Sequence, residues 1–268
     1  MPPFVAMRTI ESRHNPRLKE LRRLLAAPSR ELAAVEGPNL VEEALHAGLR
    51  VRTVFAPLGA EEFVAGLGLA EGTEILLAAR ELLGAALATE SPQPIAAVVE
   101  PPAWSWDDLL GVKNPLIVVL AGLQDPGNLG TILRSAEAFG ATGVVSLPGT
   151  VSAWNPKAVR ASAGSLFRLP LVVAQPEEAF ARLREAGVRI WTTAVRDANP
   201  APKAALASPV AIIIGNEGNG VPPEVAEQAD AALTIPCPGP VESLNAGIAA
   251  SILLYEASRQ RAGKGARR

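Results

Sequence analysis

Three segments in the second half of the chain combine polar side chains with glycines or prolines and could bind a ligand. The first, AGLQDPGNLGTILRSAEAFG (121–140), contains Asn128 and Arg134. Gly127 and Gly130 permit a tight turn and a close backbone approach to a ligand. A helix cap plus a surface arginine would explain the same residues, so the spacing leaves both interpretations open. The segment has neither the Gly-Lys-Ser/Thr of a Walker loop nor the GxGxxG of dinucleotide-binding proteins.

The second segment is IIIGNEGNGVPPE (212–224), in which three glycines occupy six positions around the carboxylate of Glu217. A simple strand-to-helix turn needs one glycine. Gly218 and Gly220 therefore favour a loop that takes up unusual backbone angles or makes room for a ligand. We expect this loop to form one wall of a binding site, with Gly218 as a point of close backbone approach.

The third segment is LTIPCPGPVESLNAGIAASILLYEASRQR (233–261). Its prolines, at 236, 238 and 240, stiffen a loop whose backbone groups cannot all pair with one another. Ser243 or Asn245 is expected to cap the helix that follows, over 244–261. Small residues along that helix permit close helix packing, which would also explain the composition without a ligand.

Alternating strands and helices must hold these segments in place. The expected strands are 116–123, 143–147, 169–174, 188–195, 209–217 and 232–236; the expected helices between and after them are 128–139, 155–164, 176–187, 222–229 and 244–261. This order predicts an α/β domain with a mostly parallel sheet and helices on both faces. Ligands in such folds bind at the carboxyl ends of the strands, where all three segments lie.

The first half of the chain predicts a smaller α/β domain. A helix over 12–27, capped by Ser12 or Asn15, is followed by strands ending at Val35 and covering 51–56, 73–78 and 94–100. Helices up to Gly48, near 61–66 and over 79–86 separate them. The prolines and polar residues of 101–114 indicate a boundary. We therefore divide the chain into domains 1–104 and 105–268.

Composition excludes several classes of protein. Apolar residues make up 49% of the 268 residues, which is enough for a sizeable core. One cysteine and two histidines exclude an intramolecular disulfide and make a metal site improbable. No apolar run is long enough to cross a membrane, and the start lacks a signal-peptide pattern, so we expect a cytoplasmic protein that begins at Met1 or Met7.

The net charge is −2, but its distribution is uneven. Residues 8–30 carry seven Lys or Arg against Glu11 and Glu20, and residues 257–268 carry five with no acid. Such segments are often only solvated surface. Two of them at the ends of one chain fit a phosphate-binding face for nucleic acid.

Together the three segments resemble the signature motifs of the SpoU, or TrmH, family of RNA ribose methyltransferases in the SPOUT superfamily. The motifs are DPGNLGTILRSAEAFG, IIIGNEGNGVP and IPCPGPVESLNAGIAASILLYE, and the resemblance covers about 114–261. Many members have SLNVSVA where this chain has SLNAGIA, a change to small residues. The stretches SRHNPRLKELRRLL and AVEGPNLVEEAL also resemble the family's N-terminal RNA substrate-binding domain.

The resemblance implies a trefoil knot in the catalytic domain and a homodimer whose active site draws on both chains. It implies S-adenosylmethionine as methyl donor, bound by six residues: Gly215, Asn216, Gly218, Ile235, Pro236 and Leu244. Arg134 would activate the ribose 2′-hydroxyl, either as a base or by stabilising charge. Four further residues would orient it and the ribose: Asn128, Glu217, Ser243 and Asn245.

The expected reaction is methyl transfer to a ribose 2′-hydroxyl of structured RNA, with 23S ribosomal RNA as the expected substrate. A tRNA ribose methyltransferase is the first alternative. A catalytically inactive RNA-binding protein is another, and the intact set of polar motif residues argues against it. A nucleotide-dependent oxidoreductase lacks support, because GxGxxG is missing after the first strand of either half.

Overall fold

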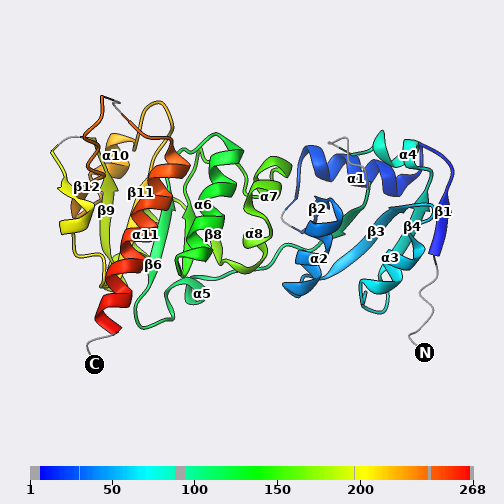
Figure 1. Cartoon of the computed structure of the whole chain (residues 1–268), viewed down its shortest axis with the longest axis horizontal. Coiled ribbons are helices and arrows are strands. Elements are labelled where there is room, and N and C mark those ends of the chain that lie inside the picture. The colour runs from blue at the N-terminus through cyan, green and yellow to red at the C-terminus, as the bar shows by residue number, and fades with distance from the viewer. Residues whose placement is uncertain (1–6, 30, 88–93, 196, 241–242, 266–268) are drawn as a thin grey trace. The chain divides into compact units, whose positions relative to one another are not determined.

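The computed structural model describes residues 7–29, 31–87, 94–195, 197–240 and 243–265 (Figure 1). The chain divides into two compact units. Unit 1 comprises Met1–Ala103 and Trp154–Phe167, and unit 2 comprises Trp104–Ala153 and Arg168–Arg268. Helices and strands alternate along both, as the sequence predicts for α/β domains.

Unit 1 contains a five-stranded mixed sheet in the order β1-β4-β3-β5-β2. The strands are β1 (Met7–Ile10), β2 (Ala33–Glu36), β3 (Val51–Pro57), β4 (Glu74–Ala78) and β5 (Ala96–Val99), and the helices that follow four of them are α1 (Pro16–Ala26), α2 (Pro38–His46), α3 (Glu61–Gly66) and α4 (Arg80–Gly84). Strands β1, β4 and β3 pair in parallel, whereas β5 is antiparallel to both β3 and β2. The smaller α/β domain is therefore confirmed, and β1 is a strand that the sequence analysis missed.

Helix α1 shows why the N-terminal prediction worked. The side chain of Asn15 accepts a hydrogen bond from the backbone N–H of Arg17 and so caps the helix, with Pro16 in its first turn. Four leucines, at 18, 21, 24 and 25, are buried. They pack into the apolar core of unit 1 with side chains from β3, β4 and α4, which leaves the opposite face of α1 in solvent.

One segment differs from the predicted domain division. The sequence analysis assigns residues 154–167 to the second domain, but α7 (Pro156–Ser162) and most of α8 (Ser165–Arg168) belong to unit 1. Helix α7 contacts β2, and Arg160 lies 4.0 Å from the buried carboxylate of Glu36. These contacts join residues more than 100 positions apart, which periodicity along the chain does not reveal.

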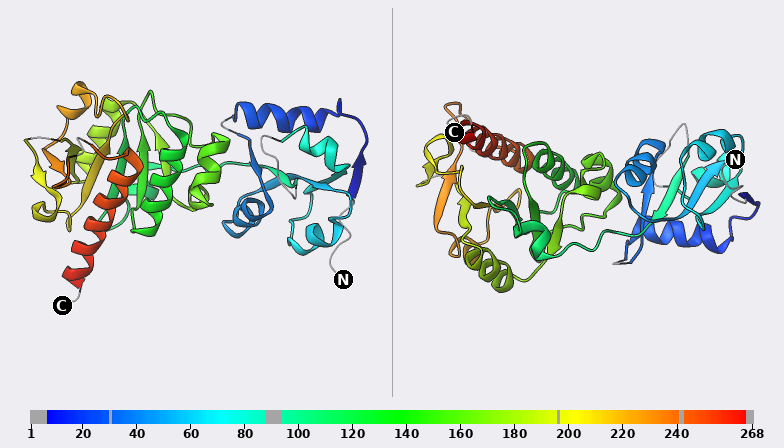
Figure 2. Two further views of the ribbon diagram at one scale, coloured as in Figure 1. Left: turned by 45° about the horizontal axis from the view of Figure 1, so that its top comes forward. Right: turned by 90° about the horizontal axis from the view of Figure 1, so that it is seen from below.

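Unit 2 is built on a seven-stranded sheet in the order β10-β12-β9-β11-β6-β7-β8. The strands are β6 (Leu116–Leu120), β7 (Gly143–Ser146), β8 (Leu171–Val173), β9 (Arg189–Thr193), β10 (Asn199–Pro200), β11 (Val210–Ile214) and β12 (Ala231–Thr234), and the helical segments are α5 (Trp106–Leu110), α6 (Pro126–Ala138), α9 (Pro176–Glu185), η1 (Ala201–Lys203), α10 (Pro223–Ala226) and α11 (Ala246–Gly265). All pairings between these named strands are parallel. Helices α5 and α9 cover one face and α6 and α11 the other (Figure 2).

The two central strands, β6 and β11, are buried at every residue because both sheet faces are covered. Their register pairs Leu120 with Ile214, so both strands end at the same edge of the sheet. The expected parallel fold is confirmed, and it brings the loops after these strands together. The trefoil knot implied by the family resemblance stays a prediction.

Candidate active site

The loops that follow β6 and β11 are joined directly. The backbone N–H of Ala121 donates to the carbonyl of Ile214 at 2.9 Å, and the side-chain amide of Asn216 donates to the carbonyl of Gly122 at 2.9 Å. Two segments that lie about 90 residues apart in the sequence thus form one continuous surface at the carboxyl edge of the sheet. The predicted motif residues of both segments lie on this surface.

The carboxylate of Glu217 is the centre of a hydrogen-bond network. It accepts from the backbone N–H groups of Gln124 and Asp125, at 3.2 and 3.0 Å, and from Nδ2 of Asn128 at 3.0 Å. Partial burial raises the pKa of Glu217, but the Asn128 amide and the backbone N–H groups outweigh it and hold the pKa below its ordinary value. Glu217 is therefore an anion that fixes the start of α6.

This lowered pKa makes an acid-dependent contribution to stability. The contribution is present above the ordinary pKa of 4.5 and is lost as pH falls below it, through the lowered folded-state pKa. Glu217→Gln should therefore have a lower melting temperature than the wild type near neutral pH, and the difference between the two melting temperatures should narrow in acid. Thermal unfolding of both proteins, followed from about pH 7 to about pH 3, measures this difference. A difference in melting temperature that stays constant with pH would show that the charge of Glu217 does not contribute to stability.

Asn128 links Glu217 to the start of α11. Its Oδ1 accepts from Nδ2 of Asn245 at 2.9 Å, while Oδ1 of Asn245 accepts from the backbone N–H groups of Gly247 and Ile248, at 2.9 and 3.2 Å. Asn245, and not Ser243, thus caps α11. Hydrogen bonds thus connect the three predicted residues Asn128, Glu217 and Asn245, one from each motif.

The interpretation of Asn128 as a helix cap is wrong. Helix α6 begins at Pro126, and the side chain of Asp125 caps it by accepting from Gly127 and Asn128 backbone N–H groups at 2.6 and 3.0 Å. Asn128 lies within the first turn, so its amide is available to Glu217 and Asn245. The sequence analysis missed Asp125 as the cap, although the proline that begins the helix favours the aspartate before it.

The glycine-rich loop closes on itself. The backbone of Asn216 exchanges two hydrogen bonds with that of Gly220, and Oδ1 of Asn216 accepts from the N–H groups of Gly218 and Asn219 at 2.9 and 3.1 Å. A Cβ atom at Gly215 would overlap the backbone of Gly220, whereas one at Gly218 would meet only Oδ1 of Asn216, at 3.6 Å. Crowding within the loop itself is thus at Gly215, while the close approach of a ligand to Gly218 stays a prediction.

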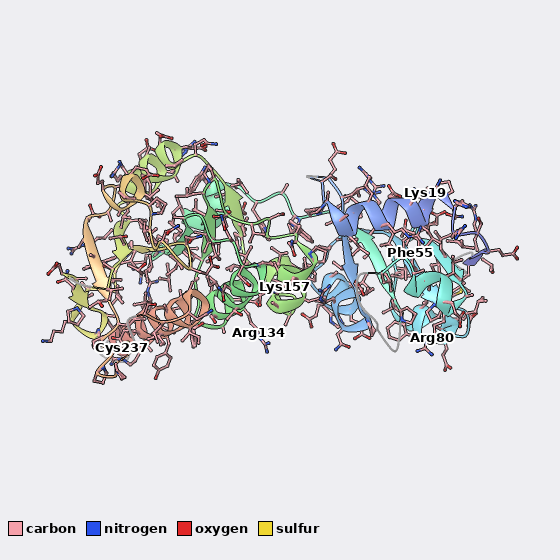
Figure 3. All side chains as sticks on the ribbon, turned by 90° about the horizontal axis from the view of Figure 1, so that it is seen from above. Lys19, Phe55, Arg80, Arg134, Lys157 and Cys237 are labelled. Atoms are coloured by element: carbon pink, nitrogen blue, oxygen red, sulfur yellow. The ribbon has the colours of Figure 1, made fainter. Side chains whose placement is uncertain are left out.

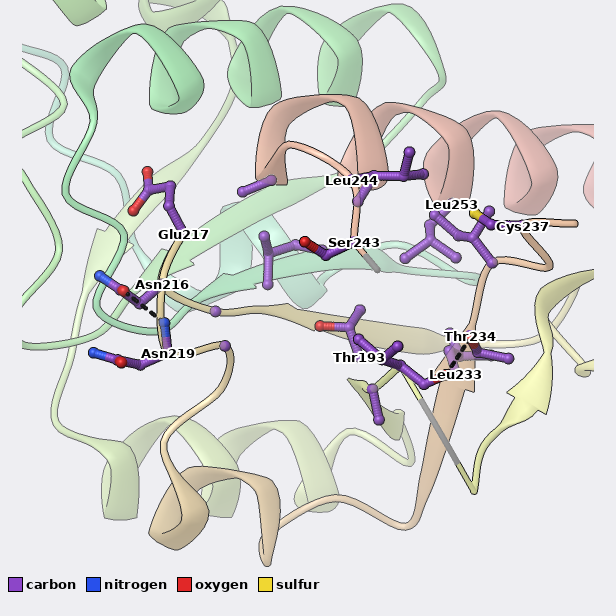
Figure 4. Close-up of a pocket in the computed structure, with 18 of the residues that line it drawn as sticks. Thr193, Asn216, Glu217, Asn219, Leu233, Thr234, Cys237, Ser243, Leu244 and Leu253 are labelled. Atoms are coloured by element: carbon purple, nitrogen blue, oxygen red, sulfur yellow. Dashed lines mark hydrogen bonds between the residues drawn. The ribbon is translucent and has the colours of Figure 1, made fainter. Parts of the chain in front are cut away.

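A cavity of about 600 Å³ lies against this loop (Figure 4). All six predicted donor-binding residues line it, as do Glu217 and Ser243. Asn216 and Glu217 lie at one end and Cys237 and Leu253 at the other. Three lining residues lie outside all three motif segments, and the sequence analysis missed them: Thr193, Ala194 and Val195. The signal that could have found them is their position at or just beyond the carboxyl end of β9, which pairs with β11.

Arg134 is separate from the cavity. Its side chain is exposed on α6 (Figure 3) and makes no hydrogen bond or ion pair to any described residue. Within the described part of one chain, Arg134 therefore makes no hydrogen bond to Asn128, Glu217, Ser243 or Asn245, and their role in orienting it stays a prediction. The amide of Asn128 is instead shared by Glu217 and Asn245.

Helices α6 and α11 are clamped together beside Arg134. The hydroxyls of Ser135 and Ser251 lie 2.7 Å apart, and a Cβ atom at Gly247 would lie 3.3 Å from the side chain of Thr131. Small residues in α11 thus serve close packing against α6, one of the alternatives that the sequence left open. The outer side of α11 carries exposed apolar side chains at Ile248, Ile252 and Tyr255.

The basic C-terminal segment is only partly available to phosphate. Arg259 forms an ion pair with Glu256 at 2.7 Å. The guanidinium of Arg261 donates to four backbone carbonyls, those of Asn114, Pro115, Leu206 and Ser208, and burial lowers its pKa. Arg261 fastens α11 to the loops before β6 and β11, so the predicted phosphate-binding role is wrong for this residue. Lys264, Arg267 and Arg268 have side chains outside the described part of the structure.

The described residues contain no group of three or more His, Cys, Asp or Glu side chains placed to hold a metal ion. Within the same ranges, no helix is long and apolar enough to cross a membrane.

A parallel sheet whose carboxyl edge carries a cavity of about 600 Å³ and a glycine-rich loop is typical of α/β enzymes that bind a small ligand at that edge. Comparison with known families makes the class specific. Residues 115–255 match the SpoU rRNA methylase family, and residues 34–105 match the RNA 2′-O ribose methyltransferase substrate-binding family. The chain belongs to the SpoU rRNA methylase family, which confirms the resemblance seen in its motifs.

Relatives match along nearly the whole chain. The 23S rRNA (guanosine(2553)-2′-O)-methyltransferase RlmP of Bacillus subtilis is 34% identical over 252 residues, which cover 93% of this chain and 98% of that protein. A crystal structure of an AdoMet-bound rRNA methyltransferase from Sinorhizobium meliloti is 31% identical with a TM-score of 0.85, covering 94% of this chain and 98% of its own. The SpoU methyltransferase AviRb from Streptomyces viridochromogenes, in complex with AdoMet, is 30% identical with a TM-score of 0.80, covering 93% and 99%.

Proposed function

We propose that this chain methylates a ribose 2′-hydroxyl of 23S ribosomal RNA, in the cytoplasm, with S-adenosylmethionine as methyl donor. The observation that carries the proposal is the cavity walled by the loops after β11 and β12 and by the start of α11, which are the second and third motifs. Family membership supplies the reaction class. The similarity to RlmP extends over both units, which favours ribosomal RNA over tRNA.

The cavity suits the donor in size and lining. Its volume of about 600 Å³ falls within the range of small-molecule sites, and Leu233, Leu244 and Leu253 give it apolar walls. The loop at Gly215 leaves backbone groups of 215–220 at the wall. Bound S-adenosylmethionine would supply an electrophilic methyl group for the ribose oxygen, whose proton must leave.

We assign the predicted motif residues to two roles, donor binding and positioning. Gly215, Asn216 and Gly218 would hold the donor from the second motif, and Ile235, Pro236 and Leu244 from the third. Glu217, Asn128 and Asn245 are positioning residues, because their hydrogen bonds hold the three motifs in one arrangement. Such preorganisation keeps the reacting atoms aligned and the site dry.

We assign Arg134 to the RNA. An arginine is a poor base because its free pKa is above about 12. Its exposed charge is instead suited to the developing negative charge on the ribose oxygen or to a neighbouring phosphate. Because Arg134 is outside the cavity of its own chain, we propose a homodimer in which it serves a site shared with the partner subunit.

The exposed apolar strip on α11 supports the homodimer. Ile248, Ile252 and Tyr255 are 52%, 38% and 55% exposed and occupy successive turns of one helix. Light scattering should give about twice the 27.9 kDa chain mass. Ile252→Glu should yield a folded monomer with little activity, because a charge would be buried at the interface. Val173→Glu, at a side chain 77% exposed on the edge strand β8, is the matched control. A wild-type monomer at micromolar concentration would refute the shared site.

Mapping of 2′-O-methylation tests the function. RNA from a strain that lacks this gene should miss one ribose methylation in 23S rRNA, and the purified protein with S-adenosylmethionine should restore it. Restoration in tRNA alone would place the protein with the tRNA enzymes. Donor and RNA binding without methyl transfer would identify an inactive RNA-binding protein.

A further inference from the structure

Helix α1 carries cations of two kinds, which the sequence does not distinguish. Arg17 is engaged: its guanidinium lies 3.1 Å from the carboxylate of Glu20 and 2.8 Å from that of Glu74. Hydrogen bonding to Glu20 and the charge of Glu74 raise the pKa of Arg17 above its ordinary value. Glu20 is the one acid within α1, so its charge is already neutralised.

Three other cations on or just before α1 have no such partner. The side chains of Arg13, Lys19 and Arg23 are exposed and make no hydrogen bond or ion pair to any residue that the structure describes. Lys19 and Arg23 are four residues apart and share one face of the helix, which points away from the buried leucines (Figure 3). Arg22 donates to the carbonyl of Arg13 at 3.4 Å and so holds Arg13 near the helix.

The rest of unit 1 shows that this pattern is local. Four other arginines of the unit each lie near a carboxylate: Arg8, Arg50, Arg52 and Arg160. Arg80, at the start of α4, is the one further described cation of the unit without a partner. Unpaired positive charge is thus concentrated on the outer face of α1. Neither matched family range includes this helix.

We propose that Arg13, Lys19 and Arg23 form a phosphate-binding strip that grips the RNA substrate outside the methylated nucleotide. The inference rests on the proposed function for the identity of the RNA. Exposed cations without carboxylate partners can neutralise phosphates at no cost in broken ion pairs, whereas Arg17 would have to leave two acids. Contacts of this kind add affinity and position the RNA but read no sequence.

The test compares two triple variants that remove equal charge. R13Q/K19Q/R23Q removes the strip, and the matched control R8Q/R17Q/R52Q removes three paired cations. Affinity for unmodified 23S rRNA is measured over a series of salt concentrations. For the strip variant we expect the slope of log affinity against log salt to fall by about 2, or about 0.7 per lost phosphate contact. We expect roughly tenfold weaker binding at moderate salt, on unrelated RNA as well.

The control variant should keep the wild-type slope, although it should melt slightly lower because it loses ion pairs to Glu20, Glu74 and Glu100. The strip variant should keep the wild-type melting temperature, and both variants should keep the affinity for S-adenosylmethionine. In methylation assays the strip variant should raise KM for RNA and leave kcat at saturating RNA unchanged. An unchanged slope, or an equal fall in both variants, would overturn the proposal. Normal binding to naked rRNA with lost binding to the ribosomal particle would point to an acidic protein and would also overturn it. If the wild type fails to methylate 23S rRNA, the proposed function fails, while the slopes still decide this inference.

Discussion

Replacing Arg134 with alanine is expected to lower methyl transfer by roughly 10²-fold or more, the usual scale for loss of a preorganised electrostatic group. Donor affinity should be unchanged, because Arg134 is exposed on α6 and does not line the cavity. Arg134→Lys should also have low methyl-transfer activity, since lysine keeps the positive charge but lacks the planar set of N–H donors of a guanidinium group. Single-turnover methylation of the RNA and calorimetry with S-adenosylmethionine, on the same samples, measure the two effects.

Arg182→Ala supplies the matched control for this experiment. Arg182 is exposed on α9, on the opposite face of the unit 2 sheet, and its side chain makes no hydrogen bond or ion pair to any described residue. The control should retain full activity. Near-normal turnover of Arg134→Ala would make Arg134 a plain surface residue. Loss of donor affinity in that variant would show that it supports the fold, and the chemistry would have to be assigned elsewhere.

Local sequence patterns were sufficient to predict the helices and strands and to indicate which loops line the cavity. The apolar runs of β6 and β11 and the leucine spacing of α1 indicate which residues are buried, and both patterns can be read from the sequence alone. The six predicted donor-binding residues all line the cavity, because the carboxyl ends of neighbouring parallel strands meet at one edge. Periodicity was enough to predict the strands and helices, whereas the choice of these six residues came from the resemblance to the family's motifs.

Contacts between segments that are distant in the chain could not be predicted from the sequence. Asn128 offers the same amide whether it caps α6 or bridges Glu217 and Asn245, and only the fold decides between them. The attachment of residues 154–167 to unit 1 and the burial of Arg261 against four carbonyls are of the same kind. An arginine in a basic run looks equally free in sequence whether it binds phosphate, a carboxylate or backbone.

The glycines of the second motif illustrate this limit. Three glycines in six positions indicate a sterically demanding loop, but they do not say which one bears the demand. The sequence analysis singled out Gly218 as a point of close approach for the ligand, which stays a prediction. It did not single out Gly215, where the backbone of Gly220 and Val221 occupies the space that a Cβ atom would need.

Gly215→Ala and Gly218→Ala therefore form a matched pair with opposite expected results. At Gly215 the added methyl must push apart the two halves of the loop, which are held by the hydrogen bonds between Asn216 and Gly220. Overpacking of this kind costs about 1–3 kcal/mol, so affinity for S-adenosylmethionine should fall by about tenfold or more. At Gly218 the methyl meets only Oδ1 of Asn216 at 3.6 Å, an ordinary contact, so the loop should keep its shape and the protein its melting temperature. Calorimetry and thermal unfolding on both variants give the comparison. Equal melting temperatures and equal donor affinities for the two variants would show that the loop yields freely at Gly215. Weaker donor binding by Gly218→Ala at an unchanged melting temperature would support the expected approach of the donor to Gly218.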